Sequence, residues 1–187
     1  KREFLTKIDI NNNLNLQRVR QLRVSASDLL PLQSGSFYEN KGRISPPVLG
    51  AIRRAFGLFT DRTYQIDLLS KGIFIETEKA APVRSVFDGE VKYIGDIGHY
   101  KGTVLIDHGD HFYSILSYLT NIRVTTGTPL KQGDVIANSS VNRLTGDSGI
   151  YFEIRHFTEA QNPVQWISFG NERGAQSDAQ IAAQSME

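Results

Sequence analysis

The hydrophobic positions of the chain follow a helical spacing near the N-terminus and a strand spacing further on. Between Asn11 and Leu30, apolar residues fall on one face of a helix: Leu14, Leu22, Ala26 and Leu29, with Val19 beside them. Pro31 disfavours continuation of this helix, because proline lacks a backbone N–H and clashes with the preceding turn. The spacing therefore predicts a helix over residues 11–30.

From Ile73 onward, short runs of strand-forming residues alternate with turns that contain glycine and aspartate. Glu90–Ile94 alternates polar and apolar residues, and Phe112–Tyr118 is rich in aromatic residues. Short strands at intervals of roughly 8–15 residues predict a mainly β fold, an antiparallel sheet or sandwich. We expect a hydrophobic core of Val83, Val86, Val91, Ile94, Val104, Ile106, Ile115, Val135, Ile136, Phe152 and Ile154.

The charges are divided unevenly along the chain. The 187 residues carry 21 Lys and Arg against 20 Asp and Glu, but residues 1–62 have a net charge of +6 and residues 63–187 of −5. Such a shift is typical of a boundary between two functional parts, and also of a solvated charged face. Cysteine is absent, which excludes a disulfide-stabilised fold, a cysteine-ligated metal and a cysteine nucleophile.

Taken alone, the remaining motifs indicate little chemistry. Asp107, His108, Asp110 and His111 suggest a metal site, but neighbouring strand residues point to opposite faces. The alternative is that His108 caps the turn by hydrogen bonding and His111 is exposed. The basic N-terminal third lacks the interleaved aromatic residues of a nucleic-acid surface. No apolar run approaches the ~20 residues of a membrane span, and no signal peptide is apparent.

Six segments of the chain form a pattern in their order and spacing. They are Lys71–Ile75, Ala81–Val91, Val104–Gly109, Val124–Ala137, Tyr151–Arg155 and Asn162–Ile167. Together they resemble the LytM/lysostaphin-type domain, the fold of bacterial zinc endopeptidases that cut peptidoglycan cross-links. The resemblance implies such a domain over residues 42–168, preceded by a helical lead-in and linker over residues 1–41. Residues 169–187 form a polar tail that we expect to be disordered.

Active members of this family hold zinc with an H-x-x-x-D motif and the second histidine of an H-x-H motif. The resemblance places Ser70 and Phe74 at the first pair of ligand positions, and Gly149 and Tyr151 at the H-x-H pair. Tyr118 stands at the position of a further catalytic histidine. All five positions are replaced, and phenylalanine and glycine have no ligating side chain. The resemblance therefore implies a protein that is not an enzyme and has no metal or other cofactor.

The pattern is also similar to that of EnvC-type activators, a subgroup without zinc. The similarity rests on the segment Lys41–Gly57 and on the tyrosines at positions 118 and 151. It implies a periplasmic, exported protein that binds and activates a cell-wall amidase during cell division. The expected partner-binding groove comprises Lys71, Phe74, Tyr118, Tyr151 and Arg155. An FtsEX-type membrane complex is a further implied partner, through an N-terminal coiled coil of which residues 11–30 could be a remnant.

Several alternatives stay open from the sequence. The aromatic residues could merely fill the space of the lost metal site, or the domain could bind peptidoglycan without activating an amidase. A residual metalloenzyme is the least favoured reading, because the ligands are missing. The basic helix over residues 11–30 could also plug the groove, drawn by the opposite charge of the second half.

Overall fold

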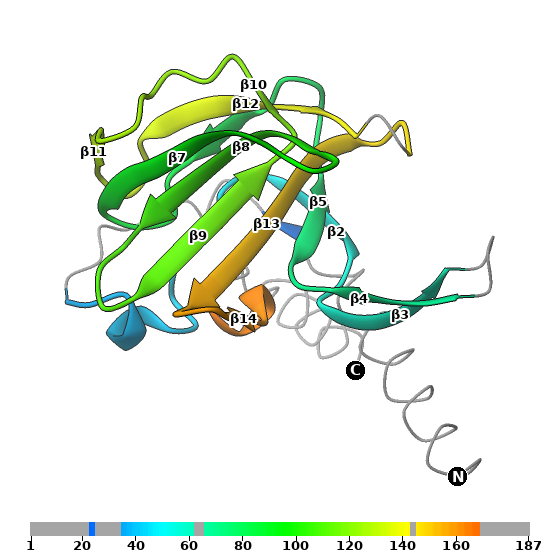
Figure 1. The fold of residues 1–187 in the computed structure, drawn as a ribbon, viewed down its shortest axis with the longest axis horizontal. Helices are drawn as coiled ribbons and strands as arrows, with labels where there is room; N and C mark the ends of the chain where they lie inside the picture. Colours follow the sequence, from blue (N-terminus) through cyan, green and yellow to red (C-terminus); the bar gives the residue numbers. More distant parts are fainter. Residues whose placement is uncertain (1–22, 25–34, 62–65, 143–144, 169–187) are drawn as a thin grey trace, which may run out of the picture.

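The computed structural model describes residues 23–24, 35–61, 66–142 and 145–168, and these form a mainly β structure (Figure 1). The described residues contain no α-helix, only the short 3-10 helices η2 (Tyr38–Asn40) and η3 (Pro163–Gln165). The strands are β1 (Arg23–Val24), β2 (Gly50–Arg54), β3 (Gly57–Asp61), β4 (Ile66–Ser70), β5 (Ile73–Glu76), β6 (Pro82–Arg84), β7 (Gly89–Ile97), β8 (Tyr100–Asp107), β9 (Phe112–Ser117), β10 (Leu119–Thr120), β11 (Pro129–Leu130), β12 (Val135–Val141), β13 (Ser148–His156) and β14 (Glu159–Gln161). The predicted mainly β, antiparallel fold is confirmed.

Most strands belong to one antiparallel sheet with the order β1-β2-β5-β13-β9-β8-β7-β11. Strand β12 branches from β13 and also pairs with β6 and β10, so these three strands lie above one end of the main path (Figure 1). Strands β3 and β4 pair only with each other and form a hairpin that projects beside the sheet. The sheet therefore folds over itself and leaves this hairpin outside.

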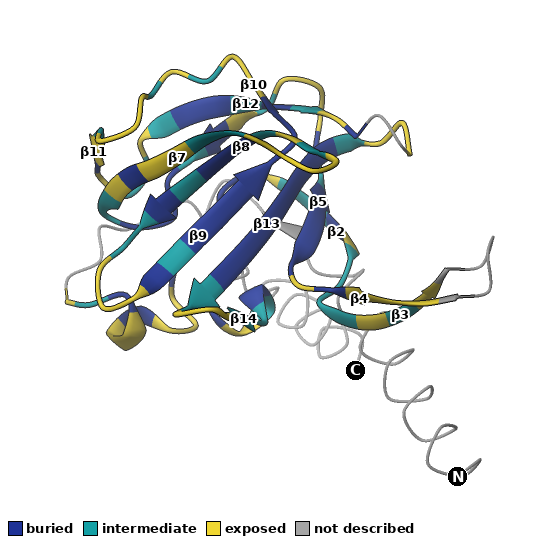
Figure 2. Ribbon diagram, viewed as in Figure 1, coloured by how far each residue is buried: buried dark blue, intermediate teal, exposed yellow. Residues whose placement is uncertain are grey.

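The hydrophobic core lies between the central strands and the β6–β12 layer, where Figure 2 shows the buried residues. Nine of the eleven predicted core residues are buried. Ile94 and Val135 are only half-buried, and both lie next to irregularities in strand pairing, which follow Gly95 on β7 and Val135 on β12. Phe37, which precedes the predicted domain, is 1% exposed and stacks on Phe112.

The helix predicted over residues 11–30 is wrong at its only described positions. Arg23 and Val24 form β1, which pairs with Ala51 and Gly50 of β2. The open edge of β2 offers backbone hydrogen bonds to an extended segment, and a β-branched valine suits that conformation. The rest of the predicted helix, and the polar tail over residues 169–187, lie outside the described residues. Within the described part of the chain, no helix is long and apolar enough to cross a membrane.

Strand β13 organises the molecule because it is buried on both faces from Gly149 to Ile154. Successive side chains of a strand point to opposite faces of the sheet. Ile150, Phe152 and Ile154 therefore face the core, and each is 0% exposed. Gly149, Tyr151, Glu153 and Arg155 share the opposite face. The residues predicted to form a site are positioned by this second face.

Candidate functional site

Three of the predicted groove residues form a compact aromatic cluster. Phe74 of β5 lies directly opposite Tyr151 of β13, and the Phe74 and Tyr118 rings pack edge to face with centroids 6.1 Å apart. The three side chains are only 3–5% exposed, so they fill the space between their strands. A partner would meet mainly the edges of this cluster and the side chains around it. Their role in binding stays a prediction.

The ring of Phe74 occupies the space above Gly149. A Cβ atom at residue 149 would lie 2.8 Å from Cζ of Phe74 and would also collide with the backbone oxygen of Ile75. The missing side chain at Gly149 and the large side chain at Phe74 are therefore one structural feature. Gly72 allows a similar close approach, because a Cβ there would lie 2.9 Å from the Tyr151 hydroxyl oxygen.

Polar groups run along the second face of β13 in an ordered row. The Tyr151 hydroxyl donates a hydrogen bond of 2.9 Å to Oε2 of Glu153, and Nε of Arg155 donates one of 2.6 Å to Oε1. The Glu153 side chain is only 5% exposed, so its charge depends on these two donors. Burial raises the pKa of Tyr151, and the charge of Glu153 raises it further, so the phenol stays a neutral donor.

Tyr118 has an unusual backbone at the end of β9. Its φ of +63° lies in the left-handed region, which bulky residues rarely adopt. Two backbone hydrogen bonds hold it there: its N–H donates to Lys101 O at 2.7 Å, and Ser140 N–H donates to its carbonyl at 2.8 Å. This conformation points the ring toward Phe74 rather than along the strand.

Two residues near the cluster were not predicted from the sequence. Tyr100 begins β8, and its ring centroid lies 4.6 Å from that of Tyr151 and 5.7 Å from that of Tyr118. Burial raises the pKa of Tyr100, whereas its hydrogen bond with Tyr151 and the positive charge of Arg54 lower it. Arg54 pairs with Phe74 across the β2–β5 ladder. Tyr100 belongs to none of the quoted motifs, and Arg54 lies within the Lys41–Gly57 segment without being singled out there; only the strand pairing brings them to this face.

The edge of the cluster carries positive charge. Lys71 is exposed in the turn between β4 and β5, next to Gly72. Arg155 is about one-third exposed while it binds Glu153. Arg54 and Arg155 therefore place two cationic groups at the aromatic rings, and Lys71 adds a third positive charge in the turn that leads into β5.

The residues at the five family ligand and catalytic positions do not fit a zinc ion. Phe74 and Gly149 offer no donor, and the Tyr151 hydroxyl is directed at Glu153. The Ser70 hydroxyl donates to Gly72 O at 2.8 Å. Among the described residues, no group of three or more His, Cys, Asp or Glu side chains could hold a metal. The four-residue cluster suggested from Asp107 to His111 is therefore not assembled.

His108 instead forms hydrogen bonds, as the alternative to a metal site predicted, but it joins the turn before β7 to strand β9 rather than capping its own turn. Its Nδ1 lies 2.8 Å from Asp88 O and its Nε2 lies 2.8 Å from Ser114 Oγ. Burial lowers the pKa of His108 to about 4, against the opposing effect of the Asp88 carbonyl. His111 is exposed, as predicted.

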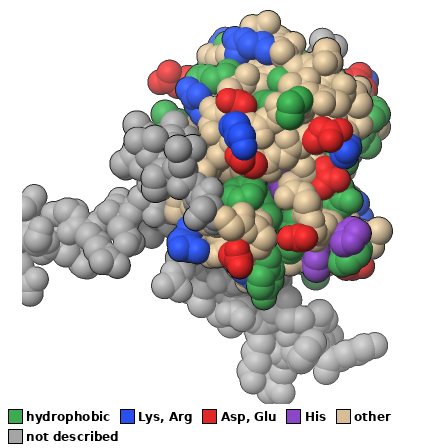
Figure 3. Space-filling view, turned by 90° about the vertical axis from the view of Figure 1, so that its left-hand side faces the viewer, with side chains coloured by type: hydrophobic (Ala, Val, Ile, Leu, Met, Phe, Trp, Pro, Cys, Tyr) green, Lys and Arg blue, Asp and Glu red, His purple; other side chains and the backbone are tan. Residues whose placement is uncertain are grey.

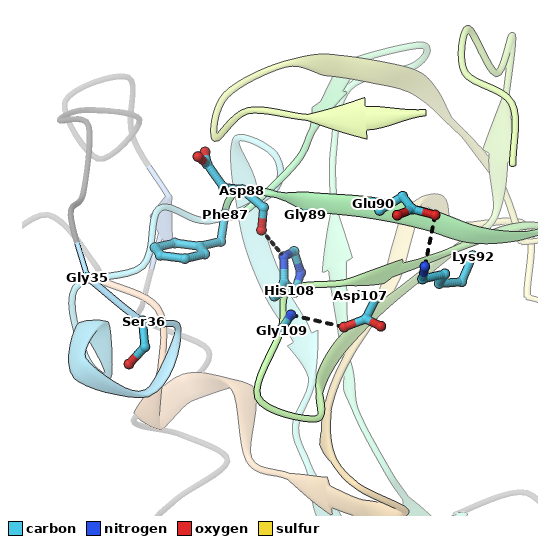
Figure 4. Close-up of a pocket in the computed structure, with 10 residues that line it drawn as sticks. All are labelled: Gly35, Ser36, Phe87, Asp88, Gly89, Glu90, Lys92, Asp107, His108 and Gly109. Carbon is cyan, nitrogen blue, oxygen red and sulfur yellow. Dashed lines mark hydrogen bonds and ion pairs between the residues drawn. The ribbon is translucent and has the colours of Figure 1, made fainter. Parts of the chain in front are cut away.

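A shallow pocket of about 470 Å³ lies beside His108 (Figure 4). Its charged groups already have partners. Glu90 pairs with Lys92 at 2.8 Å, Asp107 accepts from Gly109 N–H at 2.9 Å, and Asp88 pairs with Lys131 at 2.7 Å. None of the predicted groove residues lines it. The pocket therefore offers no set of free groups that converge on a ligand.

Comparison with known proteins agrees with the family expected from the sequence. The model of peptidase family M23 matches residues 69–163. An uncharacterised Neisseria meningitidis protein, NMB1333, is 33% identical over 131 residues, which cover 70% of this chain and 21% of that protein. The murein hydrolase activator EnvC of Escherichia coli is 27% identical over 135 residues, 72% of this chain and 31% of EnvC.

A solved structure supports the fold but not a function. A chain of the SpoIIQ–SpoIIIAH pore-forming complex superposes with a TM-score of 0.59, at 20% identity, over 69% of this chain and 92% of that one. The chain spans at most about a third of the two curated relatives described above. From the family match, which covers half of its residues, the chain belongs to peptidase family M23.

Proposed function

We propose that this protein is a non-catalytic M23 domain that binds and activates a peptidoglycan N-acetylmuramoyl-L-alanine amidase. The observation that carries the proposal is the close packing of the Phe74 ring over Gly149, which we call the Phe74–Gly149 interlock. At position 74 a ring stands where the family has a metal ligand. This ring fills the space that a side chain at position 149, the first of the H-x-H pair, would need. The absence of a donor set suited to zinc argues against hydrolysis by this chain. Similarity to EnvC, a murein hydrolase activator by name, supports an activating role.

The proposed docking surface is the cationic edge of the aromatic cluster. Arg54 and Arg155 lie at the aromatic rings and Lys71 lies in the turn that leads into β5, so the surface suits a helix with an apolar stripe and acidic flanks. Arg155 is held by Glu153, which fixes the direction of its guanidinium before a partner arrives. A pre-oriented charge loses less side-chain entropy on binding.

The proposal places the protein in the periplasm, where the peptidoglycan substrate of an amidase lies. Regulation by an FtsEX-type membrane complex would use the N-terminal segment. That segment and the suggested plug over residues 11–30 fall outside the described residues, apart from β1. Both stay predictions.

An amidase-stimulation assay with the full chain tests the proposal. Release of labelled fragments from purified peptidoglycan sacculi is measured with an amidase alone, with this protein alone, and with both. We expect release only from the pair. Lys71→Glu should weaken stimulation by roughly tenfold, because it reverses a charge at the docking edge.

The matched control is Lys92→Glu on β7, three strands away from β13 in the sheet order. It makes the same charge change and should leave stimulation intact. Release of fragments by this protein alone in the presence of zinc would refute the non-catalytic role. Equal loss of stimulation in both variants would show that overall charge matters and that the aromatic cluster is not the docking site.

A further inference from the structure

Two exposed turns at the other end of β13 hold rings in unfavourable backbone conformations. His111 has a φ of +61° and Phe157 a φ of +53°. Bulky residues rarely adopt this left-handed region, because the Cβ atom there lies too close to a backbone carbonyl oxygen. Such outliers persist where the surrounding structure imposes them, and they concentrate at ligand-binding positions.

Each residue occupies a turn position that normally belongs to glycine. Phe112 N–H donates to Gly109 O at 2.9 Å, so Asp110 and His111 are the central residues of a turn with positive φ at both positions. Asn-Gly or Asp-Gly is the usual choice for such a turn. Phe157 is the first residue of the two-residue loop between His156 and Glu159, where a positive φ again favours glycine.

The two turns join and present their rings together. Phe157 N–H donates to His111 O at 2.8 Å, and the two rings stack with centroids 4.2 Å apart and an angle of 21°. Phe157 nevertheless stays 55% exposed. Figure 3 shows histidine and hydrophobic side chains together near one edge of this side of the molecule. Burial in the core therefore does not explain why phenylalanine stands in a glycine position.

We propose that the Phe157–His111 pair is a stacking platform for a pyranose ring of a polysaccharide. The face of an aromatic ring carries partial negative charge, which attracts the C–H groups on the flat side of a sugar. Asp110 precedes His111 in the chain, Glu159 lies two residues after Phe157, and both are exposed. Within the described part of the chain neither carboxylate has a hydrogen-bond or ion-pair partner, so both are available to accept hydrogen bonds from sugar hydroxyls.

The size of the platform favours a sugar over a protein. Its exposed apolar surface is one phenyl ring in contact with the imidazoles of His111 and His156, whereas a stable protein interface buries about 800 Å² on each partner. Exposed carboxylates close to the rings in the sequence also suit the many hydroxyl donors of a glycan.

The platform is separate from the aromatic cluster. Tyr151 and Phe157 are six residues apart along β13 and its turn, which places them about 20 Å apart at the rise of a strand. The stacking role does not depend on amidase activation. Only the choice of N-acetylhexosamine as the sugar rests on the proposed function, because that sugar builds the peptidoglycan strand.

The test combines binding and stability in one variant of the full chain. Binding to soluble N-acetylglucosamine oligomers and to protein-free peptidoglycan sacculi is measured without any amidase. Phe157→Gly should lower both affinities at least about tenfold, because it removes the stacking ring. Its melting temperature should not fall, since glycine adopts a positive φ without strain.

Tyr93→Ala is the matched control, because Tyr93 is an exposed aromatic residue on β7, 40% exposed. It should bind both probes as the unaltered protein does. Unchanged binding in Phe157→Gly would overturn the proposal, as would a lack of binding to oligomers by the unaltered protein. Binding to sacculi but not to oligomers would likewise overturn it, because recognition would then rest on a part of peptidoglycan other than the sugar. If Phe157→Gly lowers the melting temperature but leaves binding unchanged, the Phe157 ring has only a structural role and the proposal is wrong.

Discussion

The two faces of β13 are both buried, but they are stabilised in different ways. On the core face, Ile150, Phe152 and Ile154 are 0% exposed and carry no polar side-chain atom. On the other face, Tyr151 and Glu153 are 4–5% exposed and depend on directed hydrogen bonds. Apolar packing tolerates small shifts, whereas a buried carboxylate fixes the position of each donor around it. The second face is therefore the better support for a surface of defined geometry.

Ionisable groups follow the same division. On the core side, His108 is held neutral by burial, and its ring stacks on Phe37 with centroids 4.8 Å apart. On the other side, Glu153 is matched by the guanidinium of Arg155. The core side holds its ionisable group in the neutral form, whereas the other side pairs a buried charge with an opposite one. Acid and substitution should therefore change the stability of the two sides by different amounts.

The largest effect is expected from Phe152→Ala on the core face. Removal of a fully buried ring should lower the free energy of unfolding by about 3–5 kcal/mol, because a cavity remains in a tightly packed core. Phe74→Ala on the other face should cost roughly 1–2 kcal/mol less, since half-buried Tyr100 can move into the space. Urea denaturation of both variants measures the difference. Equal losses of unfolding free energy in the two variants would mean that both faces of β13 contribute equally to stability.

A smaller effect is expected from acid. The pKa of His108 is lowered to about 4 in the folded protein, against an ordinary value of 6.5. Between these pH values His108 is protonated in the unfolded chain but stays neutral in the folded protein. The free energy of unfolding therefore falls as the pH falls from 6.5 toward 4. We expect a loss of about 1–3 kcal/mol over that range.

Urea denaturation at several pH values checks this expectation. His108→Gln cannot titrate but keeps a donor for Asp88 O, so its stability should vary less across the same range. Identical pH profiles for the two proteins would contradict the assignment of the effect to His108.

The smallest effect is expected from Tyr151→Phe. Loss of the hydroxyl leaves one buried oxygen of Glu153 without its donor, while Arg155 still binds the other. The free energy of unfolding should fall by about 1–2 kcal/mol. Tyr93→Phe is the control, because the Tyr93 hydroxyl donates to Asp96 O at an exposed position. If both substitutions lower the free energy of unfolding equally, the Tyr151–Glu153 hydrogen bond contributes no more to stability than a hydrogen bond at the surface.

The sequence predicted the core side well, because its signal is local. Alternation of apolar residues in Ile150–Ile154 directly indicates one buried face. The hairpin β3–β4 was not predicted, and its leucines stay exposed on both sides, so no single apolar face marks it. The helical spacing around Val24 was overridden by pairing with β2, which no local pattern reveals.

The candidate site was predictable only in part. Phe74, Tyr118 and Tyr151 could be located through their spacing within family motifs, and the structure brings them together. The role of Glu153 depends on side chains two residues apart sharing a face, and on burial that removes water from its carboxylate. Tyr100 reaches the cluster only because β7 and β8 form a hairpin that returns to the β13 side. Long-range pairing of this kind leaves no periodic signal in the sequence.

The interlock of Phe74 and Gly149 also constrains how this chain can change over evolutionary time. Any side chain at residue 149 meets the Phe74 ring and the backbone of β5, so that position cannot vary alone. A smaller residue at position 74 would first leave a void, and only then could a larger residue replace Gly149. Each single step passes through a less stable protein, whereas the present pair is well packed. Descendants of this chain would therefore recover a histidine at this position only through coupled substitutions in two strands.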